Sequence, residues 1–103
     1  MKAQILTLAS TLLLAATAHA SSDDAWAEHD QQLLQACTAA SQFKDARAVG
    51  KIAVFDDNTG YSAVLLQGHY PQAHMDNLEG SELCLYNRGD KRASVTEWTP
   101  GKP

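Results

Sequence analysis

The chain is poor in basic residues and has one long apolar run. Eight Lys and Arg stand against twelve Asp and Glu, which gives a formal net charge of −4. Binding to DNA or RNA usually needs a clustered basic surface. The one basic cluster, residues 88–92, is typical of a solvated turn, so we expect no nucleic-acid partner. Because no second long apolar run follows the first twenty residues, we expect no membrane span once those residues are removed.

Motifs for nucleophilic catalysis are also missing. The sequence contains no Gly-x-Ser-x-Gly elbow, and its serines follow no motif. His29 and Asp30 could form a charge-relay pair, but that pair would also need a nucleophile. Cys37 is a poor candidate because we expect it to be bridged. The sequence therefore predicts a protein that is not an enzyme and that needs no cofactor.

Residues 1–20 have the composition of an export signal. Lys2 supplies the positive start, an apolar stretch follows, and Ala18-His19-Ala20 is the small-x-small pattern that signal peptidases cut. No cysteine lies near the cut, so a lipid anchor is not expected. We predict a periplasmic or secreted chain with a single domain over residues 21–98 and a flexible tail over residues 99–103.

The two cysteines, Cys37 and Cys84, are predicted to form one disulfide, because an exported chain meets oxidising conditions. A domain this small buries only about 60% of the surface of its unfolded chain. The bridge would close a loop of about 48 residues, which the chain-entropy account values at about 4 kcal/mol. The disulfide is therefore expected to supply much of the stability.

The residue patterns predict an α+β fold, with an N-terminal helix packed on a four-stranded antiparallel meander. Apolar residues recur at helical spacing after Ser21-x-x-Asp24, a capping-box pattern. Alternating and β-branched segments then follow, separated by turn residues. The helix is expected over 21–43, and the strands over 51–56, 61–70, 82–87 and 92–98.

One face of this sheet is expected to lack a cover. Cys84 must face the helix, so Tyr86 should face it too, while Leu83 and Leu85 should point away. The second strand is apolar on both faces, and a single helix covers one of them. The uncovered apolar surface, to which Ala63, Leu65, Leu83 and Leu85 are expected to contribute, predicts a protein partner or self-association. Trp26 and Trp98 are expected in the core or at its edge.

The loop after the second strand is the other candidate binding surface. It combines aromatic, imidazole, thioether and amide groups, and loops on rigid scaffolds often carry function. The candidate binding residues here are Tyr70, His74, Met75 and Asn77. The alternative is that Tyr70 and Met75 cap the end of the core.

Three residues of the same region could bind a metal ion. Two imidazoles and a carboxylate, from His69, His74 and Asp76, are a donor set that suits zinc or copper. The His-x4-His spacing across a proline is not an established ligand pattern. The alternative is that both histidines lie on the surface or pack in the loop.

Two segments, Leu65-Leu66-Gln67-Gly68-His69-Tyr70-Pro71 and Glu82-Leu83-Cys84-Leu85-Tyr86, resemble small uncharacterised exported proteins of Gram-negative bacteria. The resemblance covers roughly residues 37–97, and it implies no known activity, cofactor or catalytic residue. The uncovered sheet face and the loop after the second strand lead to the first functional hypothesis, a periplasmic interaction or binding module. The alternatives are an inhibitor of a hydrolase such as a lysozyme or protease, by analogy of size and compartment, and a periplasmic metal-binding protein.

Overall fold

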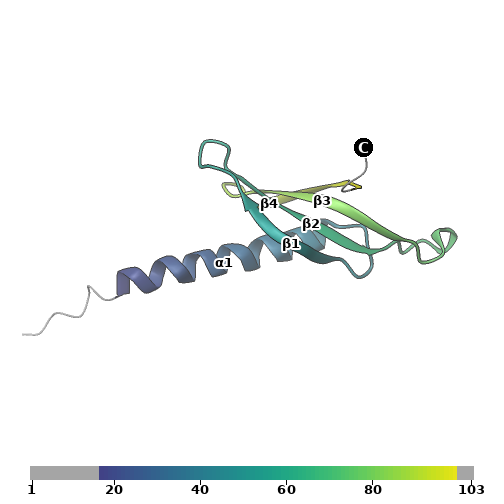
Figure 1. Ribbon diagram of the computed structural model, residues 1–103, viewed down its shortest axis with the longest axis horizontal. Coiled ribbons are helices and arrows are strands. Elements are labelled where there is room, and N and C mark those ends of the chain that lie inside the picture. Colours follow the sequence, from purple (N-terminus) through teal and green to yellow (C-terminus); the bar gives the residue numbers. More distant parts are fainter. Residues whose placement is uncertain (1–16, 100–103) are drawn as a thin grey trace, which may run out of the picture.

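The structure is a computed structural model, and it describes residues 17–99 of the chain, with side chains from residue 23. One long helix is followed by four strands and a short 3-10 turn (Figure 1). The elements are α1 (Thr17–Ala40), β1 (Arg47–Val54), β2 (Tyr61–His69), η2 (Ala73–Met75), β3 (Glu79–Asn87) and β4 (Arg92–Glu97).

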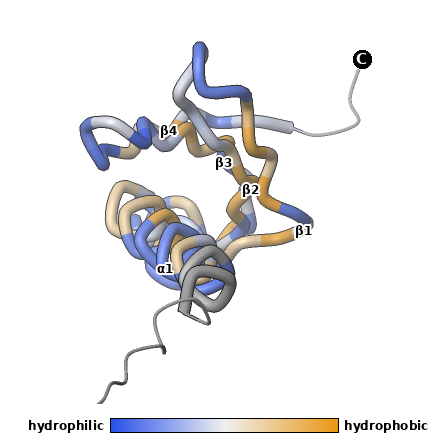
Figure 2. The backbone as a smooth tube through the Cα atoms, turned by 90° about the vertical axis from the view of Figure 1, so that its left-hand side faces the viewer, coloured by the Kyte–Doolittle hydropathy of each residue, from blue (hydrophilic) through white to orange (hydrophobic). Residues whose placement is uncertain are grey.

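The four strands form one antiparallel sheet in the order β1-β2-β3-β4, which confirms the predicted meander. Helix α1 lies across one side of this sheet, and Figure 2 shows the sheet curling around it. We call the side that faces α1 the inner face and the opposite side the outer face. The α+β fold follows from burying one stripe of the helix against one side of the sheet.

The core lies between α1 and the inner face. Leu33 and Cys37 of the helix are fully buried against Leu66, Cys84 and Tyr86 of the sheet. The predicted disulfide joins Cys37 to Cys84 in the middle of this cluster. Its sulfur atoms therefore connect the buried stripe of the helix to a central strand.

The helix bounds differ from the prediction at both ends. Helix α1 begins at Thr17, so Ser21 and Asp24 lie inside it rather than at its start. It ends at Ala40, three residues early, because Ser41 turns toward the sheet. The Ser41 hydroxyl donates to the Glu82 carboxylate at 2.6 Å, and the Phe43 N–H donates to the Ser41 hydroxyl at 3.0 Å. Sequence periodicity does not reveal the bond from Ser41 to Glu82, which is 41 residues away.

Two strands begin earlier than predicted. Strand β1 starts at Arg47 rather than at residue 51, because residues 47–49 already pair with β2 before the register shifts. Gly50, with φ of 78°, lies in that irregularity and interrupts the alternation by which a strand is recognised. Strand β3 starts at Glu79 rather than residue 82, because its first residues pair with the end of β2. Strands β2 and β4 each end one residue before the prediction.

The two tryptophans lie outside the buried core, so of the two expected places, core or edge, the core is the wrong one. Trp26 is 52% exposed and Trp98 is 46% exposed. The helix runs past the end of the sheet, so its N-terminal turns have no strand beneath them (Figure 1). Trp26 instead packs edge-on against the neighbouring His29 ring, at 5.1 Å between centroids.

Parts of the predicted domain plan fall outside the described residues. This applies to residues 1–16 of the predicted signal and to residues 100–103 of the predicted tail. Within residues 17–99, no helix combines the length and the apolar character needed to cross a bilayer.

Candidate functional site

The outer face carries a central apolar strip on which no described helix or strand packs. Leu85 is its exposed leucine, Leu65 and Leu83 are half-buried, and Ala63 is buried. Leu65 of β2 lies opposite Leu83 of β3, and Ala63 lies opposite Leu85. Leu85 is 40% exposed, whereas Tyr86 beside it is buried on the inner face. The predicted facing of β3 is therefore confirmed. Val49 and Ala53 of β1 extend the strip, because they pair with Leu65 and Ala63.

The loop between β2 and β3 divides the predicted binding residues into two groups. Tyr70 turns back onto the fold, where its ring packs edge-on against Phe43 at 5.1 Å and its hydroxyl donates to Glu97 at 2.9 Å. This hydrogen bond and burial raise the pKa of Tyr70. The alternative that Tyr70 caps the core end is thus the one observed. His74 and Asn77 are exposed, and Met75 is half-buried.

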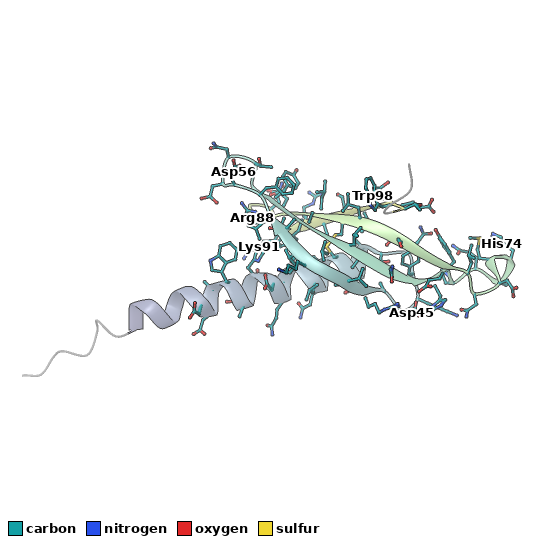
Figure 3. The ribbon with its side chains drawn as sticks, in the orientation of Figure 1. Asp45, Asp56, His74, Arg88, Lys91 and Trp98 are labelled. Carbon is teal, nitrogen blue, oxygen red and sulfur yellow. A yellow bond between two sulfur atoms is a disulfide. The ribbon has the colours of Figure 1, made fainter. Side chains whose placement is uncertain are left out.

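The predicted metal-binding trio is not assembled. The His69 imidazole is paired with Asp45, whose carboxylate accepts from the ring Nδ1 at 2.7 Å and from the His69 backbone N–H at 2.6 Å. His74 lies at the tip of the loop (Figure 3). Over residues 23–99, where side chains are described, no three His, Cys, Asp or Glu side chains are grouped so that they could share a metal ion. Among the described side chains, His69, His74 and Asp76 do not form the predicted site, because they are not grouped closely enough to share a metal ion.

The Asp45–His69 pair should make the stability of the fold depend on pH. Hydrogen bonds from the His69 side chain and then its backbone N–H hold the pKa of Asp45 below its ordinary value. A lowered folded-state pKa gives stability that is present above about pH 4 and lost as the pH falls through the folded-state pKa. We expect Asp45→Asn to lose less stability than wild type between pH 6 and pH 3, measured by urea midpoints. Asp24→Asn on the exposed helix is the control, and it should lose as much as wild type.

A hydrogen-bond chain lies between α1 and β2, and the sequence indicated its His29–Asp30 pair but not its serine. His29 Nδ1 lies 2.9 Å from Asp30 Oδ1, and His29 Nε2 lies 3.2 Å from the Ser62 hydroxyl. Because the carboxylate only accepts, Nδ1 donates to Asp30, and in the neutral ring Nε2 then accepts from the serine. Strand register, not a motif, supplies this serine, which is 33 residues away in the chain.

The Asp30–His29–Ser62 order is that of a nucleophilic triad, but its serine is closed off. Ser62 is fully buried, and its hydroxyl also accepts from the Arg88 guanidinium at 3.1 Å. A substrate carbonyl could not reach that oxygen in this arrangement. The chain of hydrogen bonds joins the helix, strand β2 and the β3–β4 turn. Its role is therefore structural. That the protein is not an enzyme stays a prediction.

Arg88 anchors one end of the sheet. Its side chain is 18% exposed and forms an ion pair of 3.5 Å with Asp57. The guanidinium also donates to the backbone carbonyls of Tyr61, Phe55 and Asp56. Arg88 therefore ties the β3–β4 turn to the β1–β2 hairpin.

Comparisons with protein-family models, with curated proteins and with solved structures find no match to this chain.

Proposed function

We propose that this chain is an exported protein-interaction module that binds through its outer face, with a second copy of the chain as the simplest occupant. Export is supported by the signal-like composition of residues 1–20, and the buried disulfide is compatible with an oxidising compartment. The uncovered apolar strip carries the proposal, since solvent-facing apolar area of this kind favours association.

The shape of the strip favours a second sheet as its occupant. Two sheets pack face to face at about 10 Å, with their inner side chains interdigitating. A two-fold axis places the same patch opposite itself, so one apolar strip supplies both halves of such an interface. The small side chains of Ala53 and Ala63 next to Leu65 and Leu85 provide the relief that interdigitation requires.

The test is the solution mass of residues 21–103, measured by light scattering across protein concentration. We expect a dimer, and we expect Leu85→Asp to shift the mass to a monomer, because a carboxylate would be buried without a partner. Leu85 is 40% exposed, so the variant should keep its fold as a monomer, as checked by circular dichroism.

Asn58→Asp provides the matched control, since it adds a carboxylate in an exposed turn of the β1–β2 hairpin. This variant should remain dimeric. A wild-type monomer at high concentration would contradict self-association. The outer face would then be tested by capture of partners from periplasmic extract, with Leu85→Asp as the bait that should lose them.

A further inference from the structure

A second candidate site lies on the helix side of the sheet, away from the outer face. It is a groove of about 320 Å³ between α1 and the β3–β4 turn. This volume is at the lower end of the range for small-molecule pockets, and the groove is shallow and open to solvent. Its lining consists of Gln32, Gln35 and Ala36 of the helix with Tyr86 and Lys91.

Tyr86 is the buried tyrosine in the lining of this groove, and its hydroxyl is the polar group that it brings there. Tyr86 is 2% exposed, and its backbone is paired with Ser62 and Ala93 inside the sheet, so its side chain is the part that reaches the groove. Within residues 23–99 the hydroxyl has no hydrogen-bond partner, whereas Tyr61 accepts from Asn87 and Tyr70 donates to Glu97. A buried hydroxyl without a partner costs free energy, which a ligand can recover.

Lys91 brings a positive charge to the same groove. Its side chain forms no ion pair with any described carboxylate, and Figure 3 places it beside the helix. Its φ of 60° is in the left-handed region, where a glycine would fit a tight turn with less strain. The turn thus holds an unpaired ammonium group at a position that backbone geometry alone would give to glycine.

We propose that this groove binds a small molecule bearing one carboxylate, which is held between the Tyr86 hydroxyl and the Lys91 ammonium group. The amides of Gln32 and Gln35 can donate further hydrogen bonds, and Ala36 offers an apolar wall. Glu28, whose carboxylate lies 3.4 Å from the Gln32 amide nitrogen, adds negative charge nearby. A single negative charge therefore suits the groove better than a phosphate dianion.

The experiment is a titration of ¹⁵N-labelled protein with benzoate, followed by NMR, with benzamide and inorganic phosphate as comparison probes. We expect saturable shifts at Lys91 and Gln35 with benzoate, and at least about 10-fold weaker binding of benzamide, which lacks the charge. Phosphate should bind more weakly than benzoate. Lys91→Gly should also weaken benzoate binding by about 10-fold or more.

Tyr86→Phe separates a ligand group from a structural one. It removes only the hydroxyl, so benzoate binding should fall by about 10-fold or more. The unfolding midpoint should stay the same or rise, because no hydrogen bond within the described chain is lost. Tyr70→Phe is the control: it loses the bond to Glu97 but should bind benzoate like wild type.

Three results would overturn this proposal: no saturable shift with benzoate, equal binding of benzamide or phosphate, or unchanged benzoate binding by Tyr86→Phe. The outcome is independent of the outer face. Leu85→Asp should still bind benzoate, and Tyr86→Phe should keep the solution mass of wild type. Failure of either idea is therefore distinguishable from failure of the other.

Discussion

Replacing both bridged cysteines, as Cys37→Ala with Cys84→Ala, should lower the free energy of unfolding by about 4 kcal/mol. The bonded residues are 47 positions apart in sequence, so the bridge removes a long closed loop from the freedom of the unfolded chain. A small domain has only about 5–15 kcal/mol in total. The double variant should therefore unfold at a much lower urea concentration, as followed by circular dichroism.

The reduced wild-type protein is the natural comparison for this variant. Both sulfur atoms lie in the core, and each cysteine is fully buried, so reduction should be slow until the native state opens. Reduced wild type and the double alanine variant should then show similar midpoints. A double variant within about 0.5 kcal/mol of the oxidised protein would contradict the importance of the bridge.

Gly68→Ala should destabilise the protein by about 2–3 kcal/mol, because the new methyl group has no space. A Cβ at this position would lie 2.7 Å from Phe43 Cβ and 2.9 Å from Asp45 Oδ1. Phe43 Cβ is attached directly to the backbone, and the next residue, Lys44, is held by its N–H bond to the His69 carbonyl at 3.0 Å. The loop must therefore shift as a unit.

Gly89→Ala in the β3–β4 turn is the matched control for Gly68→Ala. The nearest atom to a Cβ there is 3.4 Å away. The free energy of unfolding of Gly89→Ala, obtained from urea denaturation, should therefore differ from that of wild type by less than about 0.5 kcal/mol. Equal midpoints for Gly68→Ala and wild type would show that the segment after α1 does not pack on β2 as described.

The fold class, the disulfide and the facing of β3 can all be predicted from the amino-acid sequence. These features depend on local periodicity and on a count of two cysteines, which need no knowledge of distant contacts. Once Cys37 lies on the buried stripe of a helix, Cys84 must face it, and alternation then sends Leu85 to the other side. The uncovered outer face follows from the same alternation, because β2 is apolar on both sides.

The end of helix α1, the start of strand β1 and the pairing of the polar groups depend on the tertiary structure. Ser41 leaves the helix for Glu82, which is 41 residues away, and His69 takes Asp45 as its partner instead of joining His74. The His29–Ser62 contact depends on strand register across 33 residues. The unpartnered Tyr86 hydroxyl belongs to the same group, since whether a buried hydroxyl has a partner is settled by the arrangement of all its neighbours. Local sequence patterns carry no information on such long-range pairings.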